Sequence, residues 1–341
     1  MKNLILLTAV ALAAVSCSED EGLQKGEPDA NAILFGTTVQ METKAVVKGT
    51  KIPDGEKVGL YALEAESSAS PAWQASDNLM DNIEAVSNSS GGLDYSPLRS
   101  YTVDKVYNFY AYYPYMAALQ GDGDGVVAPT ATTVPQLKVT LGKTPSAQSD
   151  YMYAAPIENY KRSSDEAGVI QKLVFRHALT QIRFKFKNTE ESDGITIKSI
   201  RVTDNDKGTM NITNGEWSGS SETSSSGNIF TFFQPTTAQT VAAGTTFDIP
   251  EQLMLFPKTG EEMVGNSTLK FELILDANGT DKKVEITPTV PAAGLTAGTS
   301  YLYTLLYNSE AKDFISLSTE VVDWVDAIGG DLPVVPDKTG D

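Results

Sequence analysis

The clearest pattern in the chain is an alternation of apolar and polar residues near its middle. Thr180, Ile182, Phe184 and Phe186 share one parity, and the residues between them are Gln, Arg and Lys. Successive side chains of a β-strand point to opposite faces, so this segment predicts a strand with one face in a core. Upstream, Leu173, Phe175 and Leu179 are apolar on the opposite parity. The change of phase after Leu179 predicts a corner, where the chain passes from one sheet to another.

Similar patterns predict strands along the rest of the chain. The first covers residues 33–41, where Ile33, Phe35, Thr37 and Val39 share one face. The others are expected at 58–63, 103–113, 134–141, 151–155, 195–203, 208–213, 229–233, 246–256, 268–276, 282–287, 300–307 and 314–325. Residues 64–100 look irregular, with room for a short helix at 73–86. Turn signals at the spacing of an all-β sandwich separate the later strands.

The first residues have the pattern of an export signal. A short basic start, an apolar run and a small-residue exit predict a secretory signal over residues 1–16. Cys17, the only cysteine, follows at the position that a bacterial lipoprotein acylates, so we expect lipid on Cys17. The alternative is a plain secretory signal with a coincidental cysteine. Residues 17–30 are polar with Gly and Pro, which predicts a flexible tether.

Composition narrows the classes of function. The 341 residues include 44 acidic and 26 basic side chains, giving a net charge of −18, which disfavours binding to nucleic acid. One cysteine and one histidine, His177, leave too few ligands for the usual zinc, haem or iron sites. We therefore expect no cofactor and no metal. Gly121–Gly125, with two aspartates, reads as a turn rather than a calcium loop.

Catalytic signatures are missing as well. No Gly-x-Ser-x-Gly elbow, phosphate-binding loop or dinucleotide fingerprint is present. His177 reads as a structural residue at the strand corner. A glycosidase needs only two carboxylates, and nothing marks one pair among the 44 acids. We therefore predict no catalytic residues and no enzyme activity.

Several segments, taken in order, resemble the fimbrillin-like (Mfa-like) lipoproteins of Bacteroidota. They are Lys44-Ala45, the aromatic run 107–114, Asp150–Ala154, Phe175-x-His177-x-Leu179, Gly298–Tyr303 and Trp324. The resemblance implies two transthyretin-like β-sandwich domains in tandem after the signal peptide and tether. We place these domains at residues 31–166 and 167–341, with the boundary in the polar loop at 160–168. It also implies a surface lipoprotein of the outer membrane that functions as a pilus subunit or anchor, with other fimbrial subunits as partners.

The resemblance further implies assembly by strand exchange. In the polymerising members a protease removes the first strand, and a strand of the next subunit fills the groove. Cleavage often follows an arginine in this family, but here Lys44 occupies the expected place. The candidate exchange residues are Ile33, Phe35 and Val39 in the first strand and Ile315, Leu317 and Val321 in the last. The alternative is that 314–325 completes its own sandwich.

A different function is also compatible with the sequence. A standalone surface lipoprotein could bind host or bacterial glycans through aromatic side chains. Trp73, Tyr95, Trp217 and the tyrosines at 107–115 are the candidates. A pilus subunit should form ladders with trimmed N-termini, whereas a glycan binder should stay monomeric and full-length.

Overall fold

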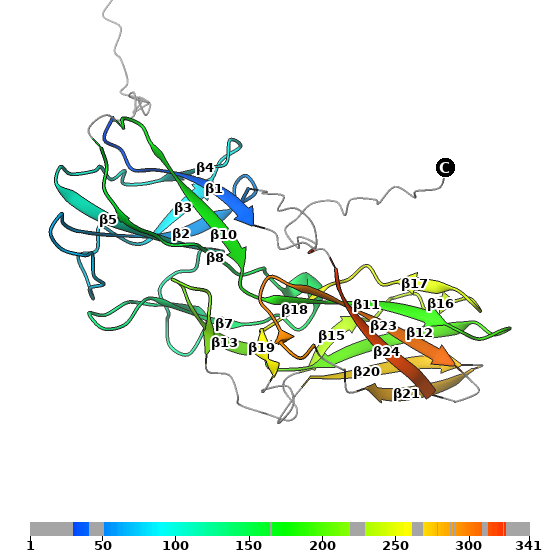
Figure 1. Ribbon diagram of the computed structural model, residues 1–341. Coiled ribbons are helices and arrows are strands. Elements are labelled where there is room, and N and C mark those ends of the chain that lie inside the picture. The colour runs from blue at the N-terminus through cyan, green and yellow to red at the C-terminus, as the bar shows by residue number, and fades with distance from the viewer. Residues whose placement is uncertain are drawn as a thin grey trace, which may run out of the picture.

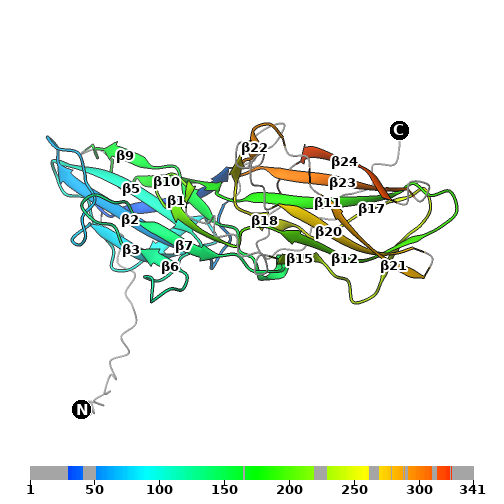
Figure 2. The ribbon, with the colours of Figure 1, turned by 90° about the horizontal axis from the view of Figure 1, so that it is seen from below.

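The structure is a computed structural model that describes residues 30–40, 51–163, 166–218, 229–260, 269–277, 279–286, 288, 291–308, 313–322 and 324. Nearly all of the regular structure in these ranges is β-strand, which confirms the all-β prediction. No helix in the described ranges is long and apolar enough to cross a membrane. The strands form two groups that lie end to end along one long axis (Figures 1 and 2).

The first group is a sheet that closes on itself, which we call the ring. Its strand order is β2-β3-β4-β1-β10-β8-β5, and β5 pairs again with β2. A further strand, β9, pairs with β5. The bounds are β1 Leu34–Gln40, β2 Lys57–Glu66, β3 Met80–Ser87, β4 Gly92–Tyr95, β5 Lys105–Tyr113, β8 Met152–Ala154, β9 Ile157–Tyr160 and β10 Ile170–His177.

A small second sheet joins strands from distant parts of the chain. It has the order β14-β13-β7-β6, with β6 at Gly125–Val127, β7 at Gln136–Thr140, β13 at Lys207–Asn211 and β14 at Trp217–Ser218. A short 3₁₀ helix, η1, follows β7 at Pro145–Ala147. Leu137, Val139 and Met210 of this sheet share a core with Tyr61 and Tyr112 of the ring. The same core continues into the last part of the chain, so the small sheet connects the two groups of strands.

The last part of the chain forms two facing sheets, which we call the C-terminal sandwich. One has the order β17-β11-β23-β24, with β18 also on β11, and the other has the order β15-β12-β20-β21, with β16 also on β12. Phe184 of β11 contacts Phe232 of β15 and Phe271 of β20, with ring centroids 4.7 and 4.8 Å away. The bounds of these strands are β11 Thr180–Asn188, β12 Ile195–Thr203, β15 Ile229–Phe233, β16 Gln239–Val241, β17 Thr246–Asp248, β18 Leu253–Leu255, β20 Lys270–Ala277, β21 Thr280–Ile286, β23 Ser300–Asn308 and β24 Asp313–Val322. A separate two-stranded sheet pairs β19 at Lys258–Thr259 with β22 at Gly294–Leu295.

The predicted corner in the middle of the chain is confirmed. Strand β10 ends at His177 in the ring, and β11 begins at Thr180 in the C-terminal sandwich. Leu173 and Phe175 are buried in the core of the ring, whereas Phe184 is buried in the C-terminal sandwich. The change of phase therefore marks a change of core.

Strand pairing crosses the predicted domain boundary at residues 166 and 167 in two places. Strand β10 follows the boundary, but it pairs with β1 and β8, which both precede it. Strand β7 precedes the boundary, but it pairs with β13, which follows it. The division into domains at 31–166 and 167–341 stays a prediction.

Residues 64–100 contain more order than the sequence indicates. They include the end of β2 and the whole of β3 and β4, and residues 73–86, which left room for a short helix, lead into and form most of β3 instead. Strand β3 pairs with β2 through a shift of register, and Asn82 has φ of 50°. Such an irregularity breaks the alternation that reveals a strand.

Close packing of β2 on β5 gives a first testable prediction. A Cβ atom at Gly59 would lie 2.0 Å from Cε1 of Tyr112, which is fully buried. The Tyr112 hydroxyl is held by Asn82 Oδ1 at 2.7 Å, so the ring cannot move away without losing this bond. We expect Gly59→Ala to lower the free energy of unfolding by about 2 kcal/mol or more, measured by urea denaturation. Gly123→Ala is the control, since its Cβ would meet only Gln120 O at 3.6 Å. An equal effect of both changes would contradict this prediction.

Candidate functional site

Strand β1 fills a slot between β4 and β10. It is parallel to β10 over all seven residues, from Leu34 beside Ile170 to Gln40 beside Arg176, and the two strands run side by side in Figure 1. On its other side β1 is antiparallel to β4, with Phe35 beside Leu93. The first strand of the chain is therefore an inner strand of the ring.

The inward side chains of this segment are packed as the alternation predicts. Ile33, Phe35 and Val39 are 0, 3 and 4% exposed, and all three belong to the core of the ring. The Phe35 ring lies 5.3 Å from that of Phe109 in an edge-on arrangement and 6.0 Å from that of Tyr95. The three predicted exchange residues of the first strand thus share one apolar slot.

One inward position of β1 is polar. Thr37 is buried, its hydroxyl donates a hydrogen bond to Gly91 O at 3.1 Å, and it accepts one from Ile52 N at 3.3 Å. The backbone N–H of Thr37 also donates to Gly91 O at 2.8 Å. Sequence reasoning placed Thr37 on the inward face but missed this role, because Gly91 is 54 positions away.

The last described strand, β24, lies at an edge of the C-terminal sandwich. It pairs antiparallel with β23, with Leu317 beside Leu305 and Val321 beside Tyr301. Val321 is 36% exposed. The predicted exchange segments are therefore in different sheets, and in this structure β24 completes its own sandwich. Cys17 and Lys44 lie outside the described residues, as does the predicted signal peptide.

A buried polar cluster marks the junction between the ring and the C-terminal sandwich. His177 Nδ1 lies 2.5 Å from Asp150 Oδ2, and the two side chains are 1 and 0% exposed. Trp324, just after β24, is stacked on the imidazole with ring centroids 4.3 Å apart. Ala178 N donates to Tyr151 O at 2.8 Å beside this cluster. The three side chains connect β10, the segment before β8 and the end of β24.

The aromatic residues considered for glycan binding are largely engaged in packing. Tyr107, Tyr110, Tyr112 and Tyr113 are buried. Burial and the nearby Glu158 carboxyl raise the pKa of Tyr110 to about 12. Trp73 is half-buried, with its ring 4.9 Å from that of Tyr110 and 5.5 Å from that of Tyr61.

The other two candidates also have internal partners. The Tyr95 hydroxyl donates to Ile33 O at 2.7 Å, so Tyr95 holds the segment that leads into β1. Trp217 Nε1 donates to Ala178 O at 2.7 Å. These side chains stabilise the fold at the slot and at the junction.

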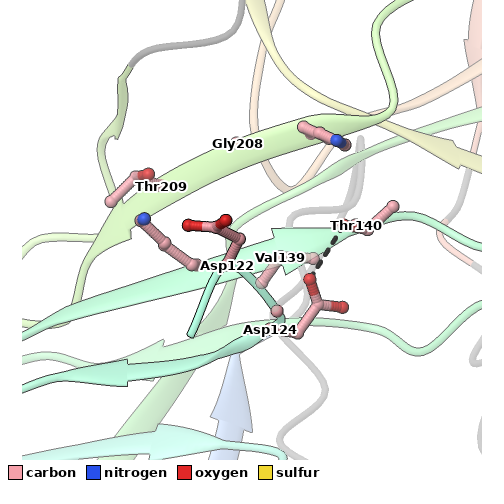
Figure 3. Close-up of a pocket in the computed structure, with 9 residues that line it drawn as sticks. Asp122, Asp124, Val139, Thr140, Gly208 and Thr209 are labelled. Carbon is pink, nitrogen blue, oxygen red and sulfur yellow. Dashed lines mark hydrogen bonds between the residues drawn. The ribbon is translucent and has the colours of Figure 1, made fainter. Parts of the chain in front are cut away.

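A polar hollow of about 170 Å³ lies between the turn before β6 and the outer face of β7 and β13 (Figure 3). Asp124 Oδ1 accepts a hydrogen bond from the Thr140 hydroxyl at 2.8 Å. Lys138 and Lys207 also line the hollow, and their positive charge opposes a divalent cation there. Within the described ranges no group of three His, Cys, Asp or Glu side chains could hold a metal ion.

Comparisons with known proteins place this fold. A sequence profile of the fimbrillin-like family matches residues 43–324. No curated protein matches the chain. A fimbrial protein from Bacteroides vulgatus has a similar structure, with a TM-score of 0.59 and 18% identity over 86% of this chain and 100% of its own. A structure from Bacteroides ovatus, described as that of a cell adhesion protein, has a TM-score of 0.55 and 18% identity over 86% and 98% of the two chains. Because the profile spans most of the sequence, this chain belongs to the fimbrillin-like family.

Proposed function

We propose that this chain is a fimbrial subunit or anchor at the cell surface that assembles by β-strand exchange and contributes to adhesion. One observation carries the proposal. The first strand of the chain is an inner strand of the ring, and the candidate processing residue, Lys44, follows it by four positions. A single cut at that place would detach β1 together with everything before it.

Removal of β1 would create a strong binding site for another strand. The facing edges of β4 and β10 would lose their partner, and the pockets of Ile33, Phe35 and Val39 would open to water. Unpaired strand edges beside an open core favour the addition of a new strand. An incoming strand would restore both the main-chain hydrogen bonds and the apolar contacts.

We further propose that lipid on Cys17 holds the unprocessed chain at the outer membrane. The tether at residues 17–30 ends at the ring, where Arg162 donates a hydrogen bond to Ala30 O at 2.7 Å. Cleavage at Lys44 would remove the lipid and β1 in one step. Membrane release and opening of the slot would then be coupled, and an uncut chain would remain an anchor. Other fimbrial subunits are the proposed partners, and the proposed function includes no chemistry.

Processing at Lys44 is tested by intact mass and N-terminal sequencing of the protein retained on and shed from its native cells. We expect chains that start at Ala45 without acyl mass, together with ladders of high mass that resist SDS. Lys44→Gln should leave acylated chains that start at Cys17 and should remove the ladders. Lys51→Gln is the matched control, because Lys51 also follows β1 in the chain but lies beyond the candidate cleavage site at Lys44. Acylated Cys17 at the start of every wild-type chain would contradict the proposal of a polymerising subunit.

A further inference from the structure

The small sheet β14-β13-β7-β6 turns one face to the core and the other to water. Leu137, Val139 and Met210 point inward and are buried. The outward side chains between and beside them form the floor of the polar hollow (Figure 3). This floor consists of Lys138 and Thr140 on β7 and Lys207 and Thr209 on β13. The hollow uses no residue of β1, β4, β10 or β24, so it is separate from the slot of β1.

Strand pairing brings the four side chains of the floor together. Lys138 lies directly opposite Thr209 in the register of β7 and β13. Thr140 lies directly opposite Lys207 in the same register. Directly opposite residues of an antiparallel pair have Cβ atoms about 5 Å apart, and diagonal neighbours are about 7–8 Å apart. Each lysine therefore stands beside a threonine hydroxyl, and the two lysines occupy opposite corners of the floor.

The floor has a firm backing. A Cβ atom at Gly208 would lie 2.8 Å from Cε1 of Phe256 and 2.9 Å from Cε3 of Trp217. The two aromatic rings thus pack directly against the inner side of β13 at the centre of the floor. Protein interiors are packed too densely for such a contact to yield easily. The floor is therefore preorganised for a ligand on its outer side.

The turn before β6 forms the wall of the hollow. Asp122 and Asp124 flank Gly123 in this turn, and Figure 3 shows both aspartates beside the two strands of the floor. The hydrogen bond from the Thr140 hydroxyl orients the Asp124 carboxylate. In the part of the chain that the structure describes, neither lysine of the floor belongs to an ion pair, and Asp122 belongs to none either. These three side chains are exposed and can reach a ligand.

The polar groups of the hollow favour a ligand whose atoms both donate and accept hydrogen bonds. An ammonium group only donates and a carboxylate only accepts, whereas a hydroxyl does both. The two lysines and two aspartates also balance in charge, so the hollow itself prefers neither an anion nor a cation. The net charge of −18 on the whole chain repels anions further. A neutral ligand with adjacent hydroxyls satisfies all of these groups.

We propose that the hollow binds one neutral pyranose ring of a surface glycan. Asp122 accepts hydrogen bonds from adjacent ring hydroxyls, and Lys138 and Lys207 donate to the same or neighbouring oxygens. Pockets for drug-sized ligands are about 300–1,000 Å³ and mostly apolar, whereas this hollow is about 170 Å³ and polar, which suits a single sugar ring. The inference deepens the proposed function, on which it rests for its place in adhesion, by naming the class of target.

The hollow is expected to bind a single sugar weakly. Val139 is buried and Gly208 has no side chain, so the lining offers no aromatic or aliphatic surface on which the ring could stack. A ligand of this size held by exposed hydrogen bonds should have a Kd on the order of 1 mM. Several copies along one fimbria would bind a polysaccharide together, and such multivalency raises avidity by about 10²–10⁴-fold.

Saturation-transfer NMR on the full-length chain tests the proposal. The probes are methyl α-mannopyranoside, methyl β-galactopyranoside and methyl β-glucopyranoside, and at least one of them should bind. Asp122→Ala and Lys138→Ala should each weaken that binding about tenfold or more, because each removes a charge-assisted hydrogen bond. Asp54→Ala is the matched control, since Asp54 is also an exposed aspartate before the glycine of a turn but lies outside the hollow. Urea denaturation should show that all three variants fold as the wild type does.

The outcomes separate the inference from the proposed function. No binding of any of the three glycosides, or equal binding by Asp122→Ala and wild type, would overturn the inference and leave fimbrial assembly intact. Tighter binding of methyl β-glucuronide than of every neutral glycoside would overturn the choice of a neutral sugar. Sugar binding that disappears with EDTA would overturn direct recognition by Asp122. Wild-type cells without SDS-resistant ladders would contradict the proposed function alone, since the hollow does not depend on strand exchange.

Discussion

Replacing Asp150 by alanine is expected to lower the free energy of unfolding by about 3 kcal/mol, measured by urea denaturation. Its carboxylate lies 2.5 Å from His177 Nδ1, and both side chains are almost fully buried. Removing Asp150 takes away the hydrogen-bond partner of His177 Nδ1 at a place that water solvates poorly. The loss of stability should be largest near the junction of the ring and the C-terminal sandwich, because the His177 imidazole is also stacked on the Trp324 ring.

Two variants separate the buried pair from general effects of charge. Asp150→Asn keeps an oxygen that can accept the imidazole N–H, so it should recover more than half of the lost stability. Asp248→Ala removes a carboxylate that pairs with Lys185 at 3.1 Å but is 74% exposed. Exposed pairs contribute about 0–1 kcal/mol, so this variant should stay close to wild type. Equal effects of Asp150→Ala and Asp248→Ala would show that burial of the first pair has no energetic importance.

The sequence predicted those strands in which one face is apolar and the other is polar. Strand β11 is the clearest example, with Ile182, Phe184 and Phe186 all buried. The corner between β10 and β11 was also predictable, since a strand that changes core must change the parity of its apolar residues. Strand β3 was missed, because a shift of register and the positive φ of Asn82 disturb its alternation.

Contacts between distant residues could not be predicted from the pattern. The pairing of β7 with β13 joins segments about 70 positions apart, and nothing in either strand specifies the other. The partner of His177 was likewise hidden, because 27 positions separate it from Asp150. The hydroxyl site of Thr37 depends on backbone atoms of Gly91 and Ile52, which carry no side-chain signal. The candidate slot was therefore predictable in its apolar half only.

Separating β1 from a chain cut at residue 44 is expected to unfold the ring unless a replacement strand is present. Ile33, Phe35 and Val39 are each at most 4% exposed, and fully burying such side chains contributes about 1.5–3 kcal/mol apiece. Their combined loss is comparable with the whole stability of a typical domain, about 5–15 kcal/mol. The main-chain pairing of β1 with β10 and β4 would be lost as well.

This unfolding should be confined to the ring, because all three side chains belong to the core of the ring and none to the core that fills the C-terminal sandwich. Hydrogen exchange followed by mass spectrometry measures the effect strand by strand. Amide protection should fall in β4 and β10 after the fragment is removed, and it should persist in β11 and β12. The cut chain with its fragment still bound is the control, and adding a peptide of residues 30–41 should restore protection. Unchanged protection in β10 after separation would mean that the slot is stable when empty, and the proposed strand exchange would then lack its main driving force.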